Sequence, residues 1–238
     1  MRYNIPVRLA LAGLVSLATT GCNDGRAAAP AAGNALQIVE LFQSQGCASC
    51  PPANRNVTAV ADGANVLALS WQVTYWDHLG WKDSFARPGF TERQRSYAQA
   101  LGHSEVWTPQ VVINGRGDVV GADRAELDRA LRRYARGRDQ ISVALKAGRV
   151  ALSGNVAKNA AVYLVRYDPR VIPVPIRAGE NGGRTLPHRN VVRELTYLGS
   201  YSGGSREWIL PSGRQAGLRT AILVQADNTG PIIAAVRD

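Results

Sequence analysis

Residues 36–51 read LQIVELFQSQGCASCP, a strand-like apolar run followed by two cysteines, Cys47 and Cys50, separated by two residues. Cysteines at this spacing, after a strand and at the start of a helix, can form a disulfide that a partner thiol reaches and breaks. The first thiol then lies at a helix N-terminus, where free N–H groups and the helix dipole stabilise a thiolate. We therefore expect Cys47 to be the nucleophile and the more exposed cysteine, and Cys50 to be the resolving thiol.

A second informative element lies sixty residues downstream, where residues 107–115 read WTPQVVING. It resembles the Thr-Pro segment of thioredoxin-like proteins, in which a cis-proline opens an edge strand opposite the Cys-x-x-Cys motif. The resemblance implies that Pro109 is cis and that Thr108 lends its backbone N–H and C=O to an extended partner by β-augmentation. The alternative is a trans proline at the start of an ordinary strand.

Longer stretches of the chain resemble DUF1223, a family of secreted bacterial proteins of unknown function. The matching stretches are residues 39–52, 74–83, 90–95, 108–110, 182–186 and 190–193. The resemblance implies an α/β thioredoxin-like domain with a central mixed sheet flanked by helices, followed by a smaller β-rich domain. It does not indicate a substrate.

The N-terminal segment predicts export. In residues 1–21, a basic flank precedes an apolar run that is too short to span a bilayer, as in a signal peptide. Residues 17–22 (LATTGC) resemble a lipobox, which predicts that Cys22 is lipid-modified; the alternative is cleavage nearby, which leaves Cys22 a free thiol. Residues 22–35, rich in Ala, Gly and Pro, then predict a lipid-anchored flexible tether. We expect the protein on the periplasmic side of a bacterial membrane, or else soluble in the periplasm or secreted.

Cysteine count and charge agree with this location. Of three cysteines, one goes to the lipid and the other two form a pair, so none is left over. The net charge is +10, and residues 141–238 carry thirteen Lys or Arg against six acidic residues. This basic part favours anionic lipid head groups or an acidic partner, unless it reflects only an Arg-rich genome. No nucleic-acid-binding motif is present, so we expect no nucleic-acid partner.

The periodicity predicts two regions with different local structure. In residues 36–140 it predicts strands at 36–43, 65–72 and 107–114, helices at 50–62, 91–101 and 123–134, and a hairpin at 114–120. In residues 141–238 it predicts short strands separated by Gly and Pro turns, typical of an antiparallel sandwich or small sheet. Those strands are expected at 141–145, 150–154, 161–167, 190–198, 207–210, 218–225 and 232–236.

Other residues carry alternative functions. A Cu(I) site of two thiolates and one His is possible, and His78 is then the best ligand candidate. A structural zinc site needs four protein ligands, and the sequence does not supply a complete set. Glu40 is either a base for Cys50 or a solvent-facing side chain. Asp77, Lys82 and Asp83 are candidates for proton transfer to the resolving thiol. The aromatic residues of segment 71–81 pack the core or form an apolar rim that receives a partner.

Taken together, the sequence predicts a thiol-disulfide oxidoreductase-like protein of the cell envelope that exchanges disulfides with a thiol- or disulfide-containing envelope protein. The pair needs no organic cofactor and no metal. Two alternatives stay open: a copper metallochaperone, and a non-catalytic binding lipoprotein in which the Cys47–Cys50 disulfide is structural.

Overall fold

The computed structural model describes Met1 and residues 35–212, 216–227 and 229–238. The predicted signal peptide (1–21), tether (22–35) and lipidated Cys22 lie outside the described residues, apart from Met1 and Ala35. Within these ranges, no helix has both the length and the apolar character needed to cross a bilayer.

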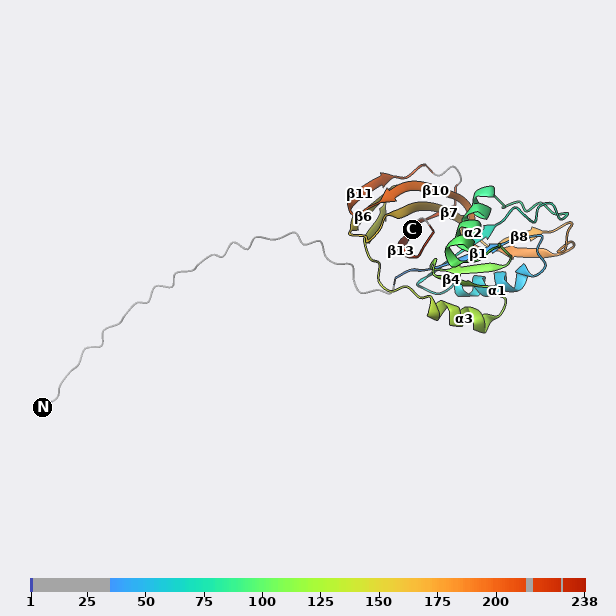
Figure 1. Cartoon of the computed structure of the whole chain (residues 1–238), viewed down its shortest axis with the longest axis horizontal. Coiled ribbons are helices and arrows are strands. Elements are labelled where there is room, and N and C mark those ends of the chain that lie inside the picture. Colours follow the sequence, from blue (N-terminus) through green and yellow to red (C-terminus); the bar gives the residue numbers. More distant parts are fainter. Residues whose placement is uncertain (2–34, 213–215, 228) are drawn as a thin grey trace. The chain divides into compact units, whose positions relative to one another are not determined.

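An eight-stranded mixed sheet, with strand order β13-β12-β7-β10-β2-β1-β3-β4, forms the centre of the fold (Figure 1). β1 pairs in parallel with β2 and antiparallel with β3, and β3 pairs antiparallel with β4. The predicted strand-helix-strand-helix-hairpin-helix order is therefore confirmed. The strands are β1 (Gln37–Gln43), β2 (Val66–Gln72), β3 (Gln110–Ile113), β4 (Gly117–Val119), β7 (Ala160–Asp168), β10 (Val191–Tyr201), β12 (Arg219–Ala226) and β13 (Ile232–Arg237).

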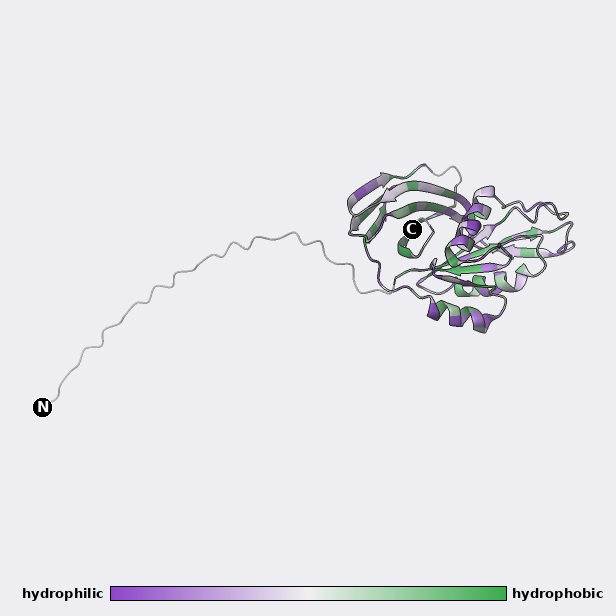
Figure 2. Ribbon diagram, viewed as in Figure 1, coloured by the Kyte–Doolittle hydropathy of each residue, from purple (hydrophilic) through white to green (hydrophobic). Residues whose placement is uncertain are grey.

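Three helices cover this sheet, namely α1 (Cys50–Val60), α2 (Pro88–Leu101) and α3 (Arg124–Arg133). Side chains alternate between the two faces of β1, because successive residues of a strand point in opposite directions. Val39 and Leu41 share a core with α1 and α3, whereas Ile38 and Phe42 share a core with α2. In Figure 2, α3 carries both hydrophobic and strongly hydrophilic residues, as expected of a helix with one buried face.

Local chemistry explains where the elements begin and end. α2 starts at Pro88, three residues before the predicted start, because a proline in the first turn lacks an N–H that would be unpaired there anyway. It ends at Gly102, whose φ of 80° is left-handed. The Thr108–Pro109 bond is cis, as the resemblance implied, and β3 begins only after it, at Gln110 rather than at residue 107.

Four of the strands after residue 141 extend the first sheet instead of forming a separate one. β10 pairs in parallel with β2 at Val191 and Ser70, and the backbone N–H of Ser70 donates to the carbonyl of Asn190. Through this pairing β10, β7, β12 and β13 extend the first sheet. The main sheet therefore contains strands from both sides of the domain boundary expected at residue 140. β10 protects what would otherwise be an open edge of β2, whose residues are almost all buried.

The remaining strands form two smaller sheets. β5 (Ser142–Lys146), β6 (Arg149–Gly154) and β11 (Gly204–Ile209) make a three-stranded antiparallel sheet. Its apolar residues, such as Val150 and Leu152, share a core with Leu164 of β7 and Ile222 of β12, so this part of the fold is two-layered. β8 (Ile172–Pro175) and β9 (Thr185–His188) form a separate two-stranded hairpin, which the sequence analysis missed.

A buried polar network lies within the core between β1 and α2. Nε and Nη2 of Arg93 donate to the two carboxylate oxygens of Glu40 at 2.6 and 2.9 Å, and the Tyr97 hydroxyl donates to the same carboxylate at 2.5 Å. Gln225 of β12 accepts from Arg93 at 3.3 Å and donates to the Tyr97 hydroxyl at 2.9 Å. The Arg93 guanidinium also lies 5.2 Å from the ring centroid of Trp71. The network therefore joins the N-terminal strand, α2 and a C-terminal strand.

This network generates a stability prediction. Arg93→Met leaves the Glu40 carboxylate buried without its cation, so we expect a loss of about 3–5 kcal/mol in the free energy of unfolding. The double variant Glu40→Leu/Arg93→Met removes both charges and should lose much less. Urea unfolding followed by tryptophan fluorescence measures both.

The matched control is Arg124→Met on α3, where Arg124 and Asp128 form an exposed pair four residues apart. Its expected cost is below about 1 kcal/mol. Equal losses for Arg93→Met and Arg124→Met would contradict the role given to the buried pair.

Candidate functional site

The two cysteines of the motif lie at the junction of β1 and α1 and form a disulfide, with 5.5 Å between their Cα atoms. α1 begins at Cys50, so Cys47 precedes the positive end of the helix dipole. The following residues, Pro51 and Pro52, have no N–H. Backbone donors for a Cys47 thiolate are therefore limited to the short loop itself, and the two prolines weaken the predicted stabilisation by the helix N-terminus.

The Thr-Pro segment adjoins this motif. The Ser49 hydroxyl donates to the carbonyl of Thr108 at 3.4 Å, and its oxygen lies 3.2 Å from Sγ of Cys47. Pro109 is buried next to Thr108. The structure thus brings together the residues that the sequence analysis selected from two segments sixty positions apart.

Both cysteines are buried, and this differs from the expectation of an exposed Cys47. The exposed fraction is 0% for Cys47 and 1% for Cys50, although Ala48 and Ser49 between them are exposed. The loop that connects β8 and β9 contacts the motif. The backbone N–H of Ala48 donates to the Glu180 carboxylate at 3.0 Å. The Asn181 side-chain amide donates to the carbonyls of Gln45 and Cys47, both at 2.9 Å.

Asp83 fixes the residues that precede Cys47. Its carboxylate accepts from the backbone N–H of Gln45 at 2.8 Å and from that of Phe85 at 2.8 Å. Burial raises the pKa of Asp83 from 3.8 to about 6. The Gln45 side chain in turn accepts from the indole N–H of Trp81 at 2.9 Å. Asp83 therefore orders the loop before the motif. Asp77 contacts this loop only indirectly, since its carboxylate accepts a hydrogen bond from the backbone N–H of Asp83.

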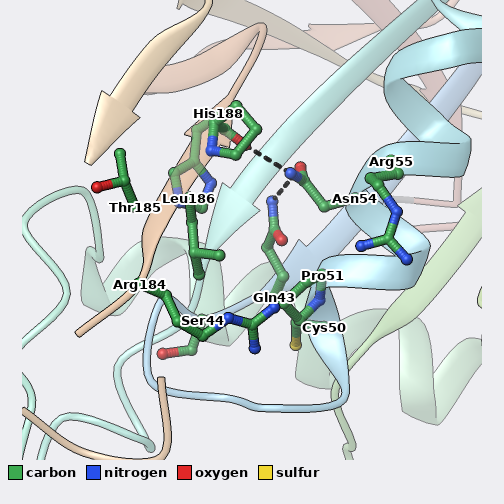
Figure 3. A pocket seen from close by; sticks show the side chains of 11 residues that line it. Gln43, Ser44, Cys50, Pro51, Asn54, Arg55, Arg184, Thr185, Leu186 and His188 are labelled. Carbon is green, nitrogen blue, oxygen red and sulfur yellow. Dashed lines mark hydrogen bonds between the residues drawn. The ribbon is translucent and has the colours of Figure 1, made fainter. Parts of the chain in front are cut away.

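A cavity of about 190 Å³ opens beside Cys50 (Figure 3). Asn54 of α1 spans it, accepting from the Gln43 side chain at 3.1 Å and donating to the carbonyl of Pro187 at 2.6 Å. His188 of β9 is 2% exposed, and neither of its ring nitrogens has a hydrogen-bond partner. Burial lowers the pKa of His188 from 6.5 to about 4, so the imidazole is neutral at pH 7. The cavity thus places an unpaired neutral imidazole near the disulfide.

Other candidate residues of the sequence lie elsewhere. Glu40 is buried against Arg93 on the α2 face of β1, opposite to α1, and is therefore placed neither to act as a base for Cys50 nor to face solvent. His78 is exposed. The part of the chain that the structure describes contains no group of three His, Cys, Asp or Glu side chains able to hold a metal ion. Trp71 is a core residue, and Trp81 is half-buried beside Gln45.

Sequence reasoning missed the hairpin residues Glu180, Asn181 and His188. The stretch 182–186 belonged to the DUF1223 resemblance, but the sequence predicted no strand and no functional residue in it. A polar Glu-Asn pair before Gly182 and Gly183 is compatible with any exposed loop. Only the pairing of β8 with β9 shows that the loop reaches the Cys-x-x-Cys motif.

The fold and the site together define a thioredoxin-like protein with a Cys-x-x-Cys disulfide at the start of its first helix. The chain belongs to the family described as "Protein of unknown function (DUF1223)", whose model matches residues 38–225. It is similar to a protein of Agrobacterium tumefaciens with a known crystal structure, at 32% identity and a TM-score of 0.70, over 86% of this chain and 94% of that one. HBP35 of Porphyromonas gingivalis shares the fold at 13% identity and a TM-score of 0.55, over 86% of this chain and 75% of that one. No curated protein matches the chain.

Asp83 and His188 oppose each other in their effects on stability between pH 4 and pH 6.5. The pKa of Asp83 is raised by folding, so the native state binds more protons and this contribution to stability falls as pH rises from 3.8 to about 6. The pKa of His188 is lowered by folding, so its contribution rises with pH from about 4 to 6.5. Over its pH range, each group changes the free energy of unfolding by about 3 kcal/mol. The two changes have opposite signs, so they should largely cancel in the wild type.

Single variants should separate the two effects. Relative to wild type, Asp83→Asn should become more stable as pH rises from 4 to 6.5, and His188→Gln should become less stable. Urea unfolding at half-unit pH steps gives the difference curves, which are insensitive to a constant loss from the substitution itself. Two parallel curves would contradict the assignment of both groups.

Proposed function

We propose that this protein exchanges disulfides with a thiol- or disulfide-containing protein of the cell envelope through Cys47 and Cys50. The observation that carries the proposal is the disulfide at the start of α1, whose loop contacts the Thr108–Pro109 segment through Ser49. A buried inert disulfide needs no such neighbour. A partner that forms a mixed disulfide can use the Thr108 backbone for strand-like pairing.

The exchange conserves electrons as follows. A partner thiolate attacks Sγ of Cys47, an intermolecular disulfide forms, and Cys50 leaves as a thiolate. A second partner thiolate then attacks the partner sulfur of that mixed disulfide and releases Cys47 as a thiolate. Two electrons pass from the partner dithiol to the pair, and the reverse sequence reduces a partner disulfide. The helix dipole favours the Cys47 thiolate as a leaving group, since thiols of lower pKa leave faster.

The cellular location is part of the proposal. A signal peptide over residues 1–21 and a lipid on Cys22 would place the exchange site on the periplasmic side of a bacterial membrane, at the end of the tether 22–35. A stable disulfide fits that compartment, because cytosolic thiols are kept reduced. With Cys22 modified, the pair is free of competition from a third thiol.

A second candidate is a binding lipoprotein whose disulfide is structural. The burial of both cysteines, at 0% and 1% exposed, favours it. Under this alternative the Glu180 and Asn181 contacts belong to a permanent packing arrangement. The copper alternative has no such support, because His78 lies exposed and no ligand triplet occurs among the described residues.

The reduction potential of the Cys47–Cys50 pair distinguishes a disulfide that takes part in exchange from a structural disulfide. We would titrate the exported protein carrying Cys22→Ala against dithiothreitol, so that only two thiols respond. A value between about −120 and −270 mV is expected for exchange. A value below about −300 mV would identify a structural disulfide and remove the exchange function.

The hairpin loop should limit access to Cys47. Glu180→Ala removes the acceptor for the exposed Ala48 N–H, and we expect reduction by dithiothreitol to accelerate about two- to tenfold, since a typical hydrogen bond contributes about 0.5–1.5 kcal/mol and about 1.4 kcal/mol is tenfold in rate. Free thiol released over time measures this rate.

Glu180→Gln separates the effect of the hydrogen bond to Ala48 from the effect of the negative charge. It keeps an acceptor for the Ala48 N–H but removes the negative charge near Cys47, so a rate close to that of the wild type is expected if the contact matters. Glu207→Ala on β11, which breaks an exposed pair with Arg149, is the matched control and should change nothing. Unchanged rates for Glu180→Ala would show that the loop does not restrict the disulfide.

A further inference from the structure

The cavity beside Cys50 has the properties of a binding site separate from the Thr108–Pro109 segment. It lies between the first turns of α1 and strand β9, and none of the residues that line it belongs to the Thr-Pro segment. At about 190 Å³ it is smaller than the 300–1,000 Å³ typical of drug-sized ligands, so it suits a single small group. Figure 3 shows Gln43, Asn54, Arg184 and His188 arranged around it.

The charges around this cavity are all positive. Arg55 and Arg184 line it, and the described residues that line it include no Asp or Glu. Neither arginine has an acidic partner within the described part of the chain; Arg184 is oriented by a 2.6 Å hydrogen bond to the Asn181 side-chain oxygen. The N-terminus of α1 adds the positive end of its dipole. Together these features favour an anion.

His188 independently indicates an occupant. It is buried among the lining residues, and both of its ring nitrogens lack partners, a costly state for a buried polar group. Its nearest aromatic neighbour, Phe85, contacts the ring edge to face at a centroid distance of 6.0 Å and offers no hydrogen bond. An occupant that accepts a hydrogen bond from the imidazole N–H satisfies this group.

We propose that the cavity binds a carboxylate, held by Arg184, Arg55 and His188, and that this carboxylate belongs to the thiol compound that reacts with the disulfide. A carboxylate accepts hydrogen bonds from guanidinium and imidazole groups and fits the available volume. Its position beside Cys50 would orient a neighbouring thiol toward the disulfide. The identification of the occupant with the exchange partner rests on the proposed function, but the binding of a carboxylate does not.

Two sources of such a carboxylate are possible, and thiol-free probes separate them. The first probe is S-methylglutathione, a small molecule with two carboxylates and a blocked thiol. The second is an acetylated, amidated hexapeptide with Asp beside a Ser that replaces cysteine, compared with the same peptide carrying Asn. We would titrate each into the full exported protein carrying Cys22→Ala and follow the His188 ring signals by NMR.

We expect saturable binding of at least one carboxylate probe, shifts of the His188 signals, and no binding of the Asn peptide. Arg184→Gln, an exposed substitution that should not affect folding, is expected to weaken binding at least tenfold, and His188→Gln severalfold. Arg189→Gln is the matched control, because this neighbouring arginine pairs with Asp62 and does not line the cavity. Binding of S-methylglutathione alone would identify a small thiol as the source, and binding of the Asp peptide alone a polypeptide.

Absence of binding for both probes, equal binding of the Asp and Asn peptides, or equal affinity in Arg184→Gln and Arg189→Gln would each overturn the carboxylate site. These outcomes are distinct from a failure of the proposed function. A reduction potential in the range of structural disulfides would remove exchange while leaving carboxylate binding intact.

Discussion

A buried ion pair between Glu40 and Arg93 lies where the N-terminal strand, the second helix and the C-terminal strands meet. Because both charges are away from water, the pair is stable only if its geometry is good and its remaining polar atoms are hydrogen-bonded. Tyr97 and Gln225 provide these further hydrogen bonds. Gln225 comes from β12, so completing the network requires the sheet to be assembled from β1 to β12. The ion pair thereby couples the part of the fold that carries the disulfide to the part that follows residue 141.

That coupling explains how a C-terminal hairpin reaches the cysteines. β10 pairs with β2, and β9 ends only three residues before β10 begins, so the hairpin of β8 and β9 must lie close to the carboxyl end of β1. From there Asn181 contacts the carbonyl of Cys47 and His188 lines the cavity beside Cys50. The β-rich region is therefore not an appendage. It supplies the loop that contacts the motif and the strand that lines the cavity beside Cys50.

Much of the fold could be predicted from sequence because the decisive signals are local. The apolar run 36–42, the Cys-x-x-Cys spacing and the Asn114-Gly115 turn each predict their own structure. β8 and β9 were missed because each contains proline, which argues against strands unless they are short and peripheral. The pairing of β10 with β2 was missed because it joins segments about 120 residues apart, and no local pattern records such a contact. The contacts of Glu180 and Asn181 with the Cys-x-x-Cys motif are nonlocal in the same way.

The burial of both sulfurs constrains any exchange chemistry. Attack on a disulfide requires the incoming thiolate to approach one sulfur directly, and rates depend on access as well as on pKa. Here the hairpin loop contacts the motif through an exposed hydrogen bond from the Ala48 N–H to Glu180 and through two buried hydrogen bonds from Asn181. Exposed contacts such as the one with Glu180 break at a lower free energy than those of the core strands. Access to the cysteines and stability of the fold therefore depend on different parts of the molecule, because the hairpin loop lies against the motif, whereas the Glu40–Arg93 network lies between β1 and α2.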